Sequence, residues 1–169
     1  VAIEGGDTYD VSCFGVDAAG QLSDDRYFIF YNQRTSPEGA ITSSGPSGAD
    51  REVFTIDLAR LPATVQRLVF TSAIDGGGTM SAVRSGALRL QANGTQLAAF
   101  PFVGSDFAAE KALIIGELYM KDIWRFAAVG QGFNGGLSAL LAHFGGEESG
   151  AAPAPTPAPA SAPRPAPTQ

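Results

Sequence analysis

Apolar and polar positions alternate along this chain in short runs, and each run is closed by Gly, Pro, Asn or Asp. A period of two places successive side chains on opposite faces of a strand, and closely spaced turn residues are typical of antiparallel sheets. The alternation predicts strands at residues 9–16, 26–32, 53–58, 65–74, 112–120 and 122–133. The pattern therefore predicts a mainly β protein.

One hairpin and one helix carry the clearest local signals. The pair Asn93-Gly94 between alternating apolar positions predicts a type I′ turn. Residues 134–146 predict a helix that is capped by Asn134 and stopped by Gly145. Its apolar side chains recur at i, i+3, i+4 and i+7, so we expect one face of this helix to pack on a sheet.

Composition divides the chain into two parts. An apolar share of 44% with eleven Phe is enough for a hydrophobic core, so residues 1–146 are expected to form one domain. Residues 147–169 contain seven of the eleven prolines and are expected to be a disordered Pro/Ala-rich tail or linker. The alternative is that this segment is a ligand for a proline-binding module.

The charge and the rare residue types exclude several classes of protein. A net charge of −6 argues against nucleic acid as a partner, and the lack of a long apolar run argues against a membrane span. The lone Cys13 and the lone His143 exclude an internal disulfide, a multi-cysteine zinc site and a two-histidine metal motif. Cys13 is expected to be a small buried strand residue. No signal peptide is apparent, so the expected location is the cytoplasm, with peripheral attachment at the inner membrane as the alternative.

Acidic residues gather in the loops around the first predicted strands. If residues 9–16 pair with residues 26–32, the loops that carry these acids can fold over one end of the sheet. Carboxylates held close together repel each other unless a cation neutralises them, and Ca²⁺ takes six to eight oxygen ligands from such loops. The alternative is that these acids are ordinary solvated residues at strand ends, because the chain has no EF-hand loop.

Motifs for catalysis are missing from the sequence. There is no G-x-S-x-G elbow, and the glycine-rich stretch at residues 75–79 lacks the Lys-Ser/Thr pair of a phosphate loop. No pattern marks a substrate cleft. We therefore expect that the protein is not an enzyme.

Several segments taken together resemble one known family. These are "YDVSCF", "SDDRYFIFYNQRTSPEGAI", "REVFTIDLARLPATVQRLVFTSAI" and "GELYMKDIWRFAAVGQGFNGGLSALLAHFG". From about Asp7 to Gly145 the chain resembles the TerD family of bacterial tellurium-resistance and general stress-response proteins. The resemblance implies a β-sandwich of two mostly antiparallel sheets with short helices, including a C-terminal helix. It also implies no enzyme activity, and calcium bound by acidic loops at one end.

The resemblance assigns candidate calcium ligands residue by residue. Asp10 matches the second acid of the family's D-L-D-x-S pattern, whose first acid is replaced by Thr8. Asp25 matches the acid that precedes F-V-F-Y-N, and Asn32 matches the amide of that motif. The resulting candidate set is Asp10, Asp24, Asp25, Asn32, Asp50 and Glu52.

The loop that carries Asp50 and Glu52 departs from the family pattern. It is shorter, and Arg51 stands where the family has an acid, so calcium affinity is expected to fall. The sequence therefore supports a stress-response domain with a weakened calcium site, and its alternative is a metal-free protein-interaction module tethered through the Pro/Ala-rich tail. Expected partners are other proteins, including stress-response or membrane-associated complexes.

Overall fold

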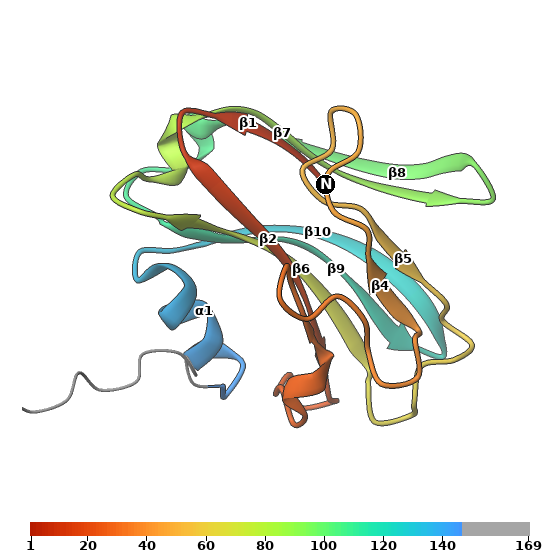
Figure 1. Cartoon of the computed structure of the whole chain (residues 1–169). Helices are drawn as coiled ribbons and strands as arrows, with labels where there is room; N and C mark the ends of the chain where they lie inside the picture. The colour runs from red at the N-terminus through yellow and green to blue at the C-terminus, as the bar shows by residue number, and fades with distance from the viewer. Residues whose placement is uncertain (147–169) are drawn as a thin grey trace, which may run out of the picture.

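The computed structural model describes residues 1–146, in which two antiparallel sheets lie face to face (Figure 1). The predicted tail at 147–169 lies outside the described residues. The large sheet contains β2 (Thr8–Val16), β3 (Phe28–Ile29), β6 (Arg67–Asp75), β9 (Ala112–Lys121) and β10 (Ile123–Phe133). The small sheet contains β1 (Ala2–Gly5), β7 (Val83–Ala92) and β8 (Thr95–Phe102).

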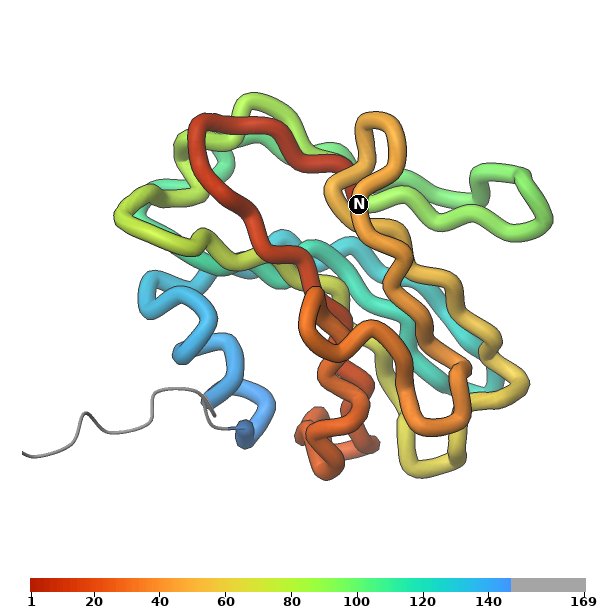
Figure 2. Tube along the Cα trace, viewed as in Figure 1, coloured from red at the N-terminus to blue at the C-terminus, as the bar shows by residue number. Residues whose placement is uncertain are grey.

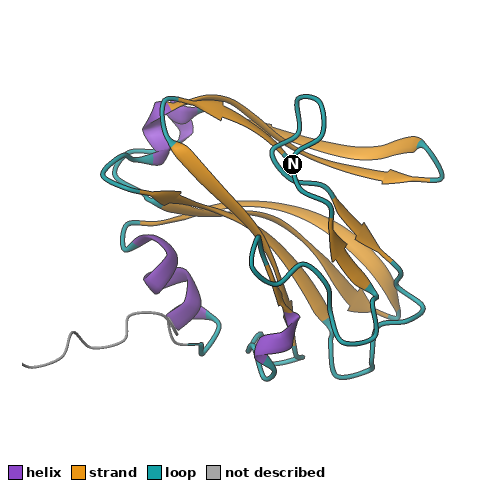
Figure 3. Cartoon of the chain, viewed as in Figure 1, coloured by secondary structure: helices purple, strands orange, loops and turns teal. Residues whose placement is uncertain are grey.

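The remaining elements are a short ribbon and four helical segments within residues 1–146 (Figure 3). The ribbon pairs β4 (Ile41–Ser43) with β5 (Phe54–Ile56). The helical segments are η1 (Asp25–Tyr27), η2 (Met80–Ala82), η3 (Gly104–Asp106) and α1 (Gly136–His143). The strand orders are β10-β9-β6-β2-β3 and β1-β7-β8, with every pairing antiparallel. The predicted fold class, a mainly β sandwich with a C-terminal helix, is confirmed.

Both sheets contribute apolar side chains to a single core. Leu88 of the small sheet lies directly over Gly116 of the large sheet, where a Cβ would be only 2.8 Å from the leucine methyl carbon. Ser12 and Thr71 are buried between β2 and β6, and their hydroxyl groups satisfy each other at 2.7 Å. Cys13 is fully buried, as predicted, and burial raises the pKa of its thiol. This cysteine is therefore an inert packing residue.

The hairpin between β7 and β8 forms where the sequence predicts it. Asn93 has a φ of 50° and Gly94 a φ of 78°, and positive φ at both central residues is the signature of a type I′ turn. This turn type matches the twist of the two strands, which project from the rest of the domain and are joined at their tip by this turn (Figure 2). The tip of the hairpin stands clear of the large sheet.

The C-terminal helix is shorter at its start than the sequence suggests. Its N-cap is Gly135 rather than Asn134, because Gly136 takes a positive φ of 65° and leaves Asn134 in the preceding turn. Its predicted end at Gly145 is confirmed. Gly145 has a φ of 73°, and the N–H groups of residues 145 and 146 bond back to the carbonyls of Ala142 and Leu141. This pattern is a Schellman motif.

The predicted strand at residues 26–32 is wrong for most of its length. The Asp24 side chain accepts a hydrogen bond of 3.0 Å from the Arg26 backbone N–H and caps η1, so the chain turns before it extends. Only Phe28–Ile29 pairs with β2. A short acidic side chain that bonds to nearby backbone commonly diverts a segment from a regular strand.

A half-buried carboxylate, that of Glu38, holds the long segment between β3 and β4. Glu38 accepts hydrogen bonds from the hydroxyl groups of Tyr27 at 2.7 Å and Ser36 at 2.8 Å. Burial and the bond to Glu38 raise the pKa of Tyr27 to about 12. Burial also acts to raise the pKa of Glu38, but the bonds from Tyr27 and Ser36 outweigh it and bring that pKa below the ordinary value of 4.5.

From the hydrogen bonds of Glu38 to Tyr27 and Ser36 we expect the domain to lose stability in acid. Because the folded state lowers the pKa of Glu38, its contribution is present above the unfolded value of 4.5 and is lost as the pH falls through the folded value. We expect Glu38→Gln to flatten the decline in unfolding free energy that the unmodified chain shows below pH 4.5. Urea unfolding of both proteins between neutral and acid pH measures this. Parallel pH profiles for the two proteins would contradict the assignment.

Within residues 1–146, no helix has the length and apolar character needed to cross a membrane.

Candidate functional site

The six predicted calcium ligands lie in separate parts of the structure. Asp10 is on β2, Asp24 and Asp25 begin η1, and Asn32 follows β3. Asp50 and Glu52 lie in the loop between β4 and β5. That loop and η1 are at opposite ends of the molecule (Figure 3). In residues 1–146 no group of three or more His, Cys, Asp or Glu side chains is placed to hold a metal ion. The structure therefore does not bring the six residues together at one end of the sheet.

Asp10 has one acidic and one basic neighbour. It pairs with Ala73 across the β2–β6 ladder, which puts Asp75 on the same face one step along. Burial raises the pKa of Asp10, Asp75 raises it further, and Arg51 acts to lower it. The Nε–H group of Arg51 donates to the Tyr9 carbonyl at 3.1 Å, which fixes the guanidinium beside this strand. The positive charge near Asp10 therefore comes from the chain itself.

Asp50 and Glu52 flank Arg51 but are engaged elsewhere. The guanidinium of Arg89, on β7, donates to an oxygen of Asp50. Glu52 is only 6% exposed, and one of its oxygens accepts the Ser43 hydroxyl at 2.7 Å and the Gly45 N–H at 2.6 Å. Asp50 thus belongs to an ion pair between the loop and the small sheet, and Glu52 to the hydrogen bonds that shape the loop.

The candidates around η1 are also tied up locally or exposed. The Asp24 carboxylate bonds to the Arg26 guanidinium at 2.7 Å, and this bond lowers the pKa of Asp24. Asp25 and Asn32 are exposed. Gln33 fixes the turn between them by donating to the Asp25 carbonyl at 2.7 Å. These residues shape the η1 turn.

A large cleft opens between the projecting hairpin and the large sheet. Its volume is about 760 Å³. The hairpin, the ribbon and strands β6, β9 and β10 supply apolar walls, which include Phe54, Leu58, Phe70, Leu88, Leu90, Leu97, Leu118, Trp124 and Phe126. Leu97 is 63% exposed at the rim, whereas most of the others are buried or half-buried. This cleft is more than twice the volume of the pocket under α1, which is about 300 Å³.

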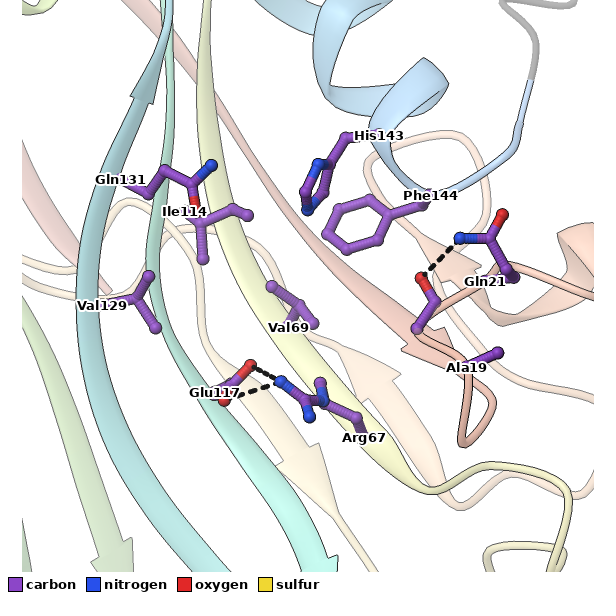
Figure 4. A pocket seen from close by; sticks show the side chains of 11 residues that line it. Ala19, Gln21, Arg67, Val69, Ile114, Glu117, Val129, Gln131, His143 and Phe144 are labelled. Atoms are coloured by element: carbon purple, nitrogen blue, oxygen red, sulfur yellow. Dashed lines mark hydrogen bonds and ion pairs between the residues drawn. The ribbon is translucent and has the colours of Figure 1, made fainter.

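A second pocket, of about 300 Å³, lies under α1 on the opposite face of the large sheet (Figure 4). His143 lines it and makes edge contacts with the rings of Phe133 and Phe144, with centroids 5.2 and 5.0 Å away. Glu117 points to Arg67, whose guanidinium nitrogen lies 2.8 and 2.9 Å from its two carboxylate oxygens. The acid of this pocket is therefore paired with an arginine and is not paired with the histidine.

The sequence analysis missed the cleft. It noted Arg51 as a cation between Asp50 and Glu52, but it missed the contact of Arg51 with β2 and the pairing of Arg89 with Asp50. Arg51 and Arg89 reach their partners across 42 and 39 residues of chain, so no local pattern could reveal them. A signal for the cleft was present in the hairpin, where the apolar Leu97 directly follows the polar residues of the turn. An exposed leucine at a hairpin tip is consistent with a binding edge.

The family model for the TerD domain matches residues 4–144. The chain belongs to the TerD family. Among its relatives, the tellurium resistance protein TerD of Serratia marcescens is 32% identical over 80% of this chain and 77% of that protein. General stress protein 16U of Bacillus subtilis is 32% identical over 84% of this chain and 80% of its own length.

Other relatives differ in how much of their length this TerD domain covers and in how closely their structures superpose on it. The tellurium resistance protein TerA of Alcaligenes is 36% identical over 69% of this chain, but the chain spans only about a third of TerA, 34% of its length. A crystal structure of a protein of unknown function superposes with a TM-score of 0.64 at 25% identity, covering 86% of this chain and 94% of that one. A TerD homologue from Streptomyces coelicolor superposes at 0.61 and 21% identity, over 82% and 86%.

The calcium that TerD membership leads one to expect does not fit the described residues. Ca²⁺ requires six or more oxygen ligands directed at one point. Here Asp50, Glu52 and Asp24 already bond to groups of the chain, and Asp10 has Asp75 as its acidic neighbour and Arg51 as its cation. The positive charge beside Asp10 and Asp75 is thus the guanidinium of Arg51.

Proposed function

We propose that this TerD domain takes part in a stress response by binding another protein in its cleft, and that this binding needs neither catalysis nor a metal ion. The observation that carries the proposal is the apolar cleft beside the hairpin, with Leu97 exposed at its rim. Concave apolar surfaces of this size are typical of binding sites. The names of the relatives, tellurium resistance proteins and a general stress protein, support the stress-response setting.

The chemistry of the candidate catalytic groups supports binding over catalysis. Cys13 is fully buried with a raised pKa, so it is a poor nucleophile. His143 contacts two aromatic rings, and the acid of its pocket is bonded to Arg67. A nucleophile or general base needs a polar partner that orients it.

A calcium titration tests metal independence. Because Arg51 supplies the positive charge beside Asp10 and Asp75, we expect the melting temperature to be the same in EDTA and in millimolar Ca²⁺. A site whose Kd is one hundredth of the calcium concentration would stabilise the folded state by about 2.7 kcal/mol, which is easily detected. A saturable rise in melting temperature would refute metal independence and restore the calcium interpretation.

Arg51→Asp is the matched variant for this titration. It replaces the guanidinium by a third carboxylate next to Asp10 and Asp75, so we expect a lower melting temperature in EDTA that calcium partly restores. Arg125→Asp, on exposed β10, is the control, and its melting temperature should not respond to calcium. Equal responses of the two variants would count against a special role for Arg51.

Site-specific photo-crosslinking tests protein binding. A photoreactive residue at Leu97 lies on the rim of the cleft, and the same residue at Val103, which is 41% exposed, lies outside it. In stressed cells we expect an intermolecular adduct from position 97, unchanged by EDTA, and none from position 103. Adducts from both positions, or from neither, would contradict binding in the cleft.

A further inference from the structure

The cleft has the features of a site for proline-rich peptides. Aromatic rings from two layers face it: Phe54 of the ribbon, and Phe70, Trp124 and Phe126 of the large sheet. Grooves lined with aromatic side chains bind proline-rich segments, because such segments are already extended and lose little conformational entropy on binding. Trp124 also offers an indole N–H that forms no hydrogen bond within residues 1–146. A donor of this kind suits the unpaired carbonyl groups of a proline-rich segment.

A segment of this composition belongs to the chain itself. Seven prolines alternate mainly with alanine between Pro153 and Pro167, directly after the described domain. The small alanine side chains add little bulk between the proline rings. Apart from Arg164, the segment from Pro153 to Pro167 carries no charge, which suits an apolar cleft.

The segment after the domain is long enough to reach the cleft. Helix α1 packs on strands β6, β9 and β10, and the cleft uses the opposite face of the same three strands. The helix ends beside β2, where the Leu22 N–H bonds to the Phe144 carbonyl and the Phe144 ring contacts Phe14. From there the chain must pass β6 and β9, at about 5 Å per strand, and go around the edge strand β10. At about 3.1 Å per residue, a proline-rich segment as long as residues 147–169 reaches about 70 Å.

We propose that the cleft binds the chain's own Pro153–Pro167 segment, which thereby competes with the protein partner for the site. This inference rests on the proposed function, because it assigns a regulator to the same cleft. Release of the segment then exposes Trp124 and the aromatic walls to the partner. The domain is thus more open to partners when its tail is displaced.

Fluorescence of Trp124, the only tryptophan, reports on the cleft directly in the full chain. The test variant replaces all seven prolines between Pro153 and Pro167 by serine. We expect the unmodified chain to have bluer emission and weaker quenching by acrylamide than this variant, at equal melting temperature. Equal emission and quenching would overturn the proposal. Protection that persists in the variant and rises with protein concentration would also overturn it, since a second copy would then cover the cleft.

Adding the segment back gives a binding constant. A synthetic peptide of residues 151–169, titrated into the proline-to-serine variant, should shift Trp124 emission to the blue in a saturable way, and a peptide with serine for proline should not. Leu97→Asp at the rim should weaken the peptide's Kd about tenfold, corresponding to about 1.4 kcal/mol. Val103→Asp, outside the cleft, should leave the Kd unchanged. Equal effects of the two variants would refute binding in the cleft.

The two proposals fail in different ways. With the photoreactive residue at position 97, a crosslink within the chain to Pro153–Pro167 reports the tail, and an adduct to another protein reports the partner. The proline-to-serine variant should gain partner adduct. If the partner adduct forms but the proline substitutions change neither it nor the fluorescence, the tail proposal alone is refuted.

Discussion

Replacing Phe14 by alanine should lower the free energy of unfolding by about 3–5 kcal/mol, the range for a fully buried aromatic ring. Phe14 is 0% exposed and joins three elements. Its ring lies 4.4 Å from that of Phe28 on β3 and 4.7 Å from that of Phe144 at the end of α1. The substitution leaves a cavity where β2, the edge strand β3 and α1 meet. Urea unfolding measures the resulting loss of unfolding free energy.

The control is the same change at a neighbouring ring. Phe30 stacks on Phe28 at 4.5 Å but is only half-buried, so Phe30→Ala should cost about 1–2 kcal/mol. If the two variants lose equal stability, the Phe14 ring does not hold α1 against the sheet as the packing indicates. A proteolysis assay that detects cleavage near α1 would separate local release of the helix from global unfolding.

The second large effect is expected at Glu52. Its alanine variant leaves the Ser43 hydroxyl and the Gly45 N–H buried without their acceptor, which should cost about 3 kcal/mol. Removing an exposed carboxylate whose only role is to bind a metal ion would leave the unfolding free energy in EDTA almost unchanged. The melting temperature and the urea midpoint of Glu52→Ala, both measured in EDTA, therefore distinguish a structural role from ligation.

Glutamine at position 52 provides the matched variant. Its amide oxygen can still accept both hydrogen bonds, so Glu52→Gln should retain most of the stability that alanine loses. A metal ligand would behave differently, because an uncharged amide binds Ca²⁺ less strongly than a carboxylate. Equal losses in the alanine and glutamine variants would contradict the hydrogen-bonding role assigned here.

Local signals in the sequence were sufficient for the elements that depend on local chemistry. The β7–β8 turn follows from Asn93-Gly94, which tolerate the positive φ that the turn requires, and the end of α1 follows from Gly145 for the same reason. The strand expected at residues 26–32 failed because the Asp24 side chain competes for backbone hydrogen bonds. Alternation of apolar and polar residues indicates which face of a strand can be buried. It gives no sign that a side chain will bond to the backbone and prevent the strand.

The candidate site was harder to predict because its energetics are long-range. Recognition of the family identified which acids to consider, but the ionic partner of each acid is decided by folding. Arg89 reaches Asp50 from a different sheet, and Arg51 is placed beside Asp10 through its bond to the Tyr9 carbonyl. The position of Trp124 in the cleft could not be predicted either. Nothing near Trp124 in the sequence shows that the hairpin leaves a cleft beside it.

The guanidinium beside Asp10 has a consequence for signalling. A metal ion comes and goes with its concentration in solution, so a domain that depends on one can report that concentration. Arg51 is covalently part of the chain, so its positive charge stays beside Asp10 whatever the calcium concentration. On the proposal of metal independence, the state of this domain is set by what occupies its other surfaces and not by the calcium concentration.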